Sequence, residues 1–286
     1  MDMDTGQIKV EELAETASQL PPLSQTTSQI ISILADPLFE VSELIKVIAL
    51  DQPLTASLLR SANSALHARP RAVATVGEAV IRLGSGTILV MAVVSSARPE
   101  SDVDLQAFGM SADGYWEHCI SCVAASEELN ARKIARFGSG FSTAALLHDF
   151  GKLILSEHIT PDRLDQLVAF QSSNPARRPV DAERTVLGVD HAVAGALVAR
   201  HWNLPDTIVT AIEAHHSPVD FEDDLTNGII LANQIALENA GQTEFASEAV
   251  ENVENAKRAL GVNDGIYREA VTASQARFEN LIELFN

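Results

Sequence analysis

The sequence predicts an all-α protein built as a two-lobed helical bundle. Apolar residues recur at helical spacing through most segments of the 286 residues, and no pair of strands is evident. Hydrophobic residues make up 46 % of the chain and aromatic residues only 5 %, so small aliphatic side chains dominate, as suits packed helices. No Gly/Ser-rich or Pro-rich linker divides the chain, which indicates one large domain or two closely packed ones.

Cap signals divide the first third of the chain into short helices. Ser42 and Asp51 are placed to accept backbone N–H groups at helix starts, and Pro53 suits the first turn after Asp51. Thr75 and Glu78 form a T-x-x-E capping box. The apolar run 87–94 fits either a buried helix or a strand, and we interpret it as a helix because no partner strand is evident. The expected helices span residues 9–19, 24–34, 42–50, 51–65, 76–83 and 87–94.

The rest of the chain has the same character. We expect helices over 113–133, 142–148, 152–158, 161–172, 180–187, 190–202, 206–216, 225–240, 246–260 and 264–285. The last one carries an amphipathic stripe and should dock on the bundle or on a partner chain; the stripe is Ile266, Val271, Phe278, Ile282 and Phe285. The predicted domains are an acidic N-terminal segment (1–19), an N-terminal helical lobe (20–104), a second helical lobe (105–240) and an acidic C-terminal helical extension (241–286).

The charge of the chain argues against two classes of partner. Lys and Arg total 20 and Asp and Glu total 39, a net charge of −19 that is concentrated at the two ends. Nucleic acids and anionic membrane surfaces both require clustered cations, so neither is expected as a partner. The start of the chain lacks the pattern of a signal peptide, and the longest apolar stretch is far shorter than a membrane span. We therefore expect a soluble cytoplasmic protein.

Histidines gather at the predicted helix termini. His118 lies in the first turns of one helix, His148-Asp149 ends another, His191 begins a third, and His215-His216 ends a fourth. Imidazole and carboxylate groups from several helix ends, meeting in one core, would suit Fe, Mn, Ni or Zn, singly or as a pair of ions. The alternative is that each histidine only compensates the dipole at a helix C-terminus.

Short motifs follow one another along residues 20–240. The first part contains Leu20-Pro-Pro-Leu23, Asp51-Gln-Pro-Leu54, Leu58-Leu-Arg-Ser-Ala-Asn63-Ser64 and Ala79-Val-Ile-Arg-Leu-Gly84. The second part contains Trp116-x-His118, Leu146-Leu-His-Asp-Phe-Gly151-Lys152, Gly188-Val-Asp-His191 with Gly195, Trp202-Asn-Leu-Pro205 and His215-His216-x-Pro218. In this order the motifs resemble those of HDOD domains, bacterial signalling proteins related to the HD metal-dependent phosphohydrolases.

The resemblance implies an HD-domain-like second lobe and a role in signal transduction. Most HDOD domains resemble hydrolases that have lost their metal ligands. This chain instead keeps residues that match the HD phosphodiesterase pattern, namely His118, His148, Asp149, Lys152, His191, His215 and His216. By that resemblance Asp149 would bridge two ions, His118 and His148 would hold one, and the remaining histidines the other. Asp149 and Lys152 would be the catalytic residues, with Lys152 facing a phosphate.

Two positions depart from the HD pattern. The final acidic ligand of the pattern comes from a helix that reads Ala-Asp, whereas here the segment reads Ala232-Asn233. The Asn233 amide oxygen can still bind a hard ion, but it is neutral and binds more weakly. The Gly-Tyr-Pro loop of cyclic-di-GMP phosphodiesterases is also absent, because Ser-Pro-Val-Asp follows His216. Both departures argue against hydrolysis of cyclic-di-GMP.

The sequence leaves distinct functional hypotheses open. The first is a regulatory module that binds an unidentified signalling protein or a small phosphorylated ligand and keeps the metal site. The alternative is an active metal-dependent phosphohydrolase on a nucleotide or phosphodiester. A third is a redox sensor through Cys119 and Cys122, although this C-x-x-C lies inside a predicted helix, where small buried residues also fit. A homodimer is compatible with each of these.

Overall fold

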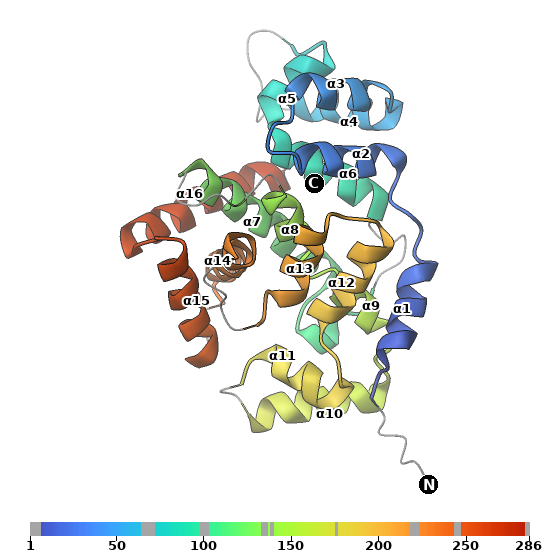
Figure 1. Cartoon of the computed structure of the whole chain (residues 1–286), viewed down its shortest axis with the longest axis vertical. Coiled ribbons are helices and arrows are strands. Elements are labelled where there is room, and N and C mark those ends of the chain that lie inside the picture. The colour runs from blue at the N-terminus through green and yellow to red at the C-terminus, as the bar shows by residue number, and fades with distance from the viewer. Residues whose placement is uncertain are drawn as a thin grey trace.

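A computed structural model describes residues 7–63, 72–97, 103–132, 137, 140–174, 177–217, 223–242 and 247–283. These residues form helices and turns with no strand among them, which confirms the predicted all-α class (Figure 1). The first helices are α1 (Val10–Gln19), α2 (Gln25–Leu34), α3 (Val41–Ala49), α4 (Gln52–Ala62), α5 (Val76–Leu83) and α6 (Ser85–Ala97).

The remaining elements carry most of the predicted site. They are a 3-10 turn (Gln106–Phe108), α7 (Ala112–Ala131), α8 (Phe141–Leu147), α9 (Gly151–Ser156), α10 (Pro161–Ser173), α11 (Pro179–Ala182), a π-helical segment (Glu183–Leu187), α12 (His191–His201), α13 (Asp206–Ala214), α14 (Asp224–Asn239), α15 (Ser247–Ala259) and α16 (Asp264–Ile282). In Figure 1 the helices α3, α4 and α5 lie at one end of the molecule, with α2 and α6 between them and the second bundle.

Several predicted caps are present in the N-terminal helices. Asp51 accepts the Leu54 N–H at the start of α4, and the Thr75/Glu78 capping box begins α5. The predicted cap at Ser42 is wrong. Helix α3 begins one residue earlier, at Val41, and the Ser42 hydroxyl donates a hydrogen bond to Glu40 Oε2 instead of accepting a backbone N–H. The ambiguous run 87–94 lies within the helix α6 and is buried on most of its surface.

Helix α7 is the central element of the second bundle. It packs against α8, α14 and α16, and it also contacts α6 of the N-terminal helices. The predicted docking of the last helix is observed, because the described members of its apolar stripe pack against the core from α16; Phe285 lies outside the described residues. Arg277 on α16 adds ion pairs to Glu127 and Glu128 on α7, and Glu127 also accepts the Gly86 N–H at the start of α6.

Helix α1 lies along α12, on the side of the bundle away from α16 (Figure 1). The Ile8 N–H donates to the Leu187 carbonyl, and Thr16 Oγ1 lies 2.9 Å from His158 Nε2. Trp202 Nε1 donates to the Pro21 carbonyl just after α1. These contacts tie the acidic N-terminal segment to the helices that carry the predicted ligands.

Two glycines allow α9 and α12 to approach each other closely. A Cβ atom on Gly151 would lie 1.9 Å from the His191 carbonyl oxygen and 2.4 Å from the Gly195 backbone nitrogen. Both neighbours are backbone atoms, so neither can move aside as a flexible side chain would. The absence of a side chain at Gly151 is therefore what places the start of α9 next to the start of α12.

No single helix among the described residues has both the length and the apolar character needed to cross a membrane. In the part of the chain that the structure describes, α5 and α6 taken together pass that test by length and composition alone, and they are bent by 107° at their junction.

We predict that Gly151→Ala destabilises the protein by about 1–3 kcal/mol, because the new methyl group overpacks a contact between two backbones. Urea unfolding followed by circular dichroism measures this. Gly77→Ala is the matched control: a Cβ there would meet only Ile45 Cδ1 at 3.4 Å, and alanine favours the helix α5. Equal stability of the two variants would contradict the close-approach argument.

Candidate metal centre

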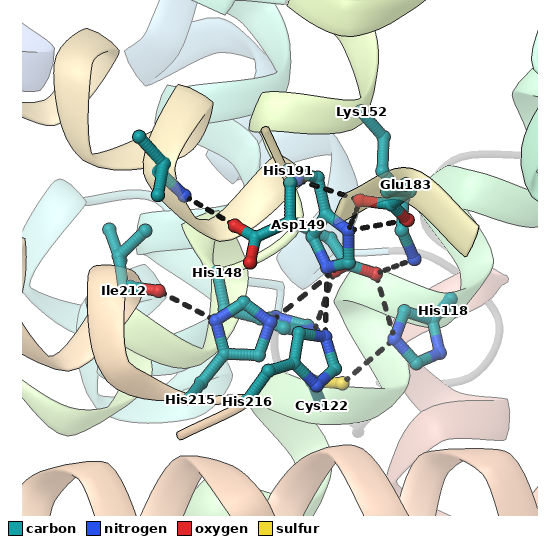
Figure 2. Close-up of polar contacts among 12 residues, drawn as sticks. His118, Cys122, His148, Asp149, Lys152, Glu183, His191, Ile212, His215 and His216 are labelled. Atoms are coloured by element: carbon teal, nitrogen blue, oxygen red, sulfur yellow. Dashed lines mark hydrogen bonds and ion pairs between the residues drawn. The ribbon is translucent and has the colours of Figure 1, made fainter. Parts of the chain in front are cut away.

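Asp149 lies between α8 and α9, and histidines from several helix ends face its carboxylate (Figure 2). Its Oδ1 lies 3.1 Å from His191 Nε2, 3.5 Å from His148 Nε2 and 3.8 Å from His215 Nε2. Its Oδ2 lies 3.4 Å from His118 Nε2. The carboxylate is buried, so it depends on these neighbours rather than on water for its electrostatic environment.

The hydrogen bonds of His148 and His215 define which ring nitrogen of each carries the proton. His148 Nδ1 lies 2.8 Å from the Ala145 carbonyl and His215 Nδ1 lies 2.6 Å from the Ile212 carbonyl. Because a carbonyl can only accept, each Nδ1 carries the proton, and in the neutral ring each Nε2 presents a lone pair. Burial lowers the pKa of both imidazoles, which favours the neutral form. Both Nε2 atoms are buried without a hydrogen-bond partner.

His191 is held by a buried carboxylate that the sequence did not single out. Its Nδ1 lies 2.7 Å from Glu183 Oε2, and its backbone N–H donates to the same oxygen at 2.8 Å. Burial would lower the pKa of His191, but the Glu183 carboxylate outweighs burial and raises the pKa to about 9. His191 Nε2 faces Asp149 and lies 2.9 Å from His216 Nε2. Glu183 thereby fixes the ring with Nε2 toward the centre of the cluster.

His118 and Cys122 lie one turn apart on α7 and face the other side of Asp149 (Figure 2). Cys122 Sγ lies 3.6 Å from His118 Nε2. Burial lowers the pKa of His118 to about 3, so the ring is neutral. Burial, together with Cys119 and Asp149, raises the pKa of the Cys122 thiol well above its ordinary value. Cys119 and Cys122 are both free thiols.

Lys152 supplies the closest positive charge to the cluster. Its Nζ lies 2.6 Å from Asp149 Oδ2, and 15 % of its side chain is exposed. Burial would raise the pKa of Asp149, but the groups that face it, first His148 and then Lys152 and His191, hold that pKa well below its ordinary value. Asp149 also raises the pKa of Lys152 in spite of burial. The pair is therefore fully ionised at neutral pH.

The structure brings all the predicted site residues into one cluster except Asn233. That residue is half-buried on α14, which packs against α7, α8 and α13. Among the described residues it makes no hydrogen bond to the cluster. Its role as a metal ligand stays a prediction.

The donor set fits divalent metal ions. The potential ligand atoms of Asp149, His191, His215 and His216 lie within 4.8 Å of one another, and so do those of His118, Cys122 and His148. Lone pairs of His148 and His215 face an ionised carboxylate oxygen, an arrangement that is repulsive unless a cation lies between them. The Nδ1–H bonds to carbonyls and to Glu183 are the outer contacts that metal-bound histidines make in proteins.

Sequence reasoning missed Glu183 and did not include Cys122 among the candidate ligands. Glu183 precedes His191 by eight residues, and the π-helical segment and a turn lie between them. Helical periodicity therefore does not predict that the two side chains meet. The signal for Cys122 was present, because His118 and Cys122 are four residues apart and therefore share a helix face. The sequence alone predicts a small core residue or a redox partner of Cys119 at this position, and Cys122 is indeed a buried free thiol.

The helical fold and the clustered histidines define an HD-like protein with a candidate metal site. Residues 20–218 match the model of the HDOD domain family, which is well over half of the chain. The chain belongs to the HDOD family.

A protein of unassigned function from Treponema pallidum is 24 % identical over 211 residues, which cover 72 % of this chain. The match spans only 39 % of that relative, so this chain corresponds to about two fifths of its length.

Solved structures show the same fold. An HDOD domain protein of unknown function from Geobacter sulfurreducens has a TM-score of 0.66 at 20 % identity, covering 96 % of this chain and 99 % of its own. A candidate signal transduction protein from Marinobacter aquaeolei has a TM-score of 0.71 at 24 % identity, covering 97 % of this chain and 60 % of its own. A candidate phosphohydrolase from Shewanella amazonensis has a TM-score of 0.63 at 22 % identity, covering 94 % and 97 %.

We predict that Glu183→Gln weakens divalent metal binding by about 10–100-fold, because the ring of His191 loses the carboxylate that orients it. Titration against a chromophoric chelator measures the affinity. Glu213→Gln is the control, since the Glu213 side chain on α13 is exposed and pairs with Arg200 rather than with a residue of the cluster. Unchanged affinity in Glu183→Gln would show that the carboxylate does not act through a metal-bound His191.

Proposed function

We propose that the chain is a regulatory module of the HDOD type that acts by binding a partner protein or a small phosphorylated ligand and retains a divalent metal centre. The observation that carries the proposal is the pair of buried Nε2 lone pairs of His148 and His215, which face the ionised Asp149 without a hydrogen bond. Side chains that served only as helix caps would not need their free nitrogens aimed at one buried carboxylate.

The metal centre is proposed to be dinuclear, with Fe, Mn, Ni or Zn as candidate ions. Asp149 would bridge the ions, with His118 and His148 on one side and His191, His215 and His216 on the other. Asn233 would supply a neutral oxygen ligand. When bound, such a pair of ions activates a water molecule and clamps a phosphoryl group.

Binding rather than turnover is the favoured function for two reasons. A neutral Asn233 in place of a carboxylate leaves one metal position with less negative charge. Lys152, the residue expected to face a phosphate, is held by Asp149 at 2.6 Å instead of being free to follow a reacting group. Both features suit a site that holds an ion and senses a ligand.

The alternative is a metal-dependent phosphohydrolase, and one observation supports it. The Lys152 side chain is partly exposed while Asp149 beneath it is buried. A phosphate that approached from solvent would therefore meet a positive charge directly beside the candidate metal centre. Asp149 and Lys152 would be the catalytic residues in that case, with cyclic-di-GMP disfavoured as the substrate.

The acidic ends of the chain are proposed to influence the choice of partner. Net charge of −19 favours a partner with a basic surface and disfavours nucleic acids and anionic lipids. A homodimer remains a further proposal, which sedimentation at several concentrations would test.

We predict that the purified protein contains about two divalent ions per chain by elemental mass spectrometry, and that Asp149→Ala contains none while it keeps the helical circular dichroism spectrum. One ion would indicate a half-filled site, which Asn233→Asp should complete. Absence of metal in every preparation, including one reconstituted anaerobically with iron or manganese, would contradict the proposal.

Two assays on the metal-loaded protein distinguish ligand binding from catalytic turnover. We expect the metal-loaded chain to bind phosphorylated nucleotides without hydrolysing phosphoesters, and Lys152→Ala to weaken that binding by about 10-fold, which corresponds to about 1.4 kcal/mol for the loss of one charge-assisted contact. Phosphate release and calorimetric titration are the two readouts. Metal-dependent release that disappears in Asp149→Ala would favour the phosphohydrolase instead.

A further inference from the structure

The two sides of the Asp149 cluster carry different donor atoms. On one side all potential ligands are nitrogen or oxygen, from Asp149, His191, His215 and His216. On the other side a sulfur atom lies among them, because Cys122 on α7 faces the same space as His118 and His148 (Figure 2). Cys122 is fully buried and shares a small cluster with Ala145 and Ala236.

The sulfur lies where a metal ligand would lie. A tetrahedral zinc ion, with Zn–S of about 2.3 Å and Zn–N of about 2.05 Å, places a donor sulfur and a donor nitrogen about 3.6 Å apart. Cys122 Sγ and His118 Nε2 are 3.6 Å apart. An S–H donor would gain little from this geometry, because sulfur is a weak hydrogen-bond donor.

Two further donors complete the same space. His148 Nε2 is buried, has no hydrogen-bond partner and lies with Cys122 Sγ and His118 Nε2 inside a group whose atoms are all within 4.8 Å of one another. Asp149 borders the same space and could provide the fourth donor: its Oδ2 lies 3.4 Å from His118 Nε2 and its Oδ1 lies 3.5 Å from His148 Nε2. The nitrogen–oxygen edge of a tetrahedral zinc site is about 3.4 Å by the same bond lengths.

We propose that His118, Cys122, His148 and Asp149 form a thiolate-containing half-site that is selective for zinc, beside a second half-site that has only nitrogen and oxygen donors. The inference rests on the proposed metal centre and assigns Cys122 as a ligand. On binding, the Cys122 S–H bond breaks, a Zn–S bond forms and the proton passes to the buffer, with no change in oxidation state. Zinc accepts thiolate and imidazole together, whereas Mn²⁺ and Mg²⁺ prefer oxygen donors.

Cobalt substitution provides the first test, because Co(II) takes the same tetrahedral sites as zinc and a bound thiolate gives it an intense near-ultraviolet charge-transfer band. The metal-free protein is titrated with Co(II). We expect the band in the wild type, its loss in Cys122→Ser, and its retention in Cys119→Ser. Cys119 is the matched control, since it is an equally buried thiol on α7 that lies outside both groups of candidate ligands.

X-ray absorption at the zinc edge of the loaded wild type gives a test that needs no variant. We expect a sulfur scatterer at about 2.3 Å from zinc. Bound zinc or cobalt with only nitrogen and oxygen neighbours, or a charge-transfer band that persists in Cys122→Ser, would overturn the assignment of Cys122 while the metal centre itself stands. Failure of the wild type to bind zinc or cobalt would also overturn the assignment of Cys122, and the proposed function would fall with it only if iron and manganese did not bind either.

Discussion

The buried carboxylate of Asp149 is the constraint on which the rest of the site depends. An isolated carboxylate is costly to remove from water, so the fold must surround it with positive charge, hydrogen-bond donors or a metal ion. Without a bound metal ion, Lys152 and the charged His191 supply positive charge to the Asp149 carboxylate. The neutral rings of His148 and His215 do not, because their lone pairs point at the same oxygen. The site is therefore incompletely compensated by protein groups, and a divalent cation would complete it.

The fold supplies this arrangement through contacts that are remote from the chemistry. The Gly151 contact holds the start of α9 against α12 and so places Asp149 beside His191. Glu183 then orients His191. Helix α7, which packs against both α14 and α16, places His118 and Cys122 on the opposite side of Asp149. If the two sides hold ions as proposed, their different donor atoms would give the two ions different metal selectivity.

Much of the fold could be predicted from the sequence, because helical periodicity and caps are local. The Thr75/Glu78 capping box and the Asp51 cap are present as predicted. The predicted cap at Ser42 was wrong because the helix already begins at Val41, and sequence patterns do not distinguish between two adjacent start positions. The convergence of the histidines could not be derived locally and came from the HDOD resemblance. Glu183 was missed because its contact with His191 depends on the path of an intervening π-helical segment and turn.

Anomalous diffraction from a crystal of the metal-loaded protein, recorded at the absorption edge of the bound ion, tests the central claim most directly. The account predicts anomalous density within bonding distance of Asp149, on the sides of His118 and His215, with the Nδ1–H bonds to Ala145 and Ile212 preserved. A crystal without anomalous density at Asp149, with Lys152 as the sole cation on that carboxylate and the rings of His148 and His215 turned to other partners, would contradict it.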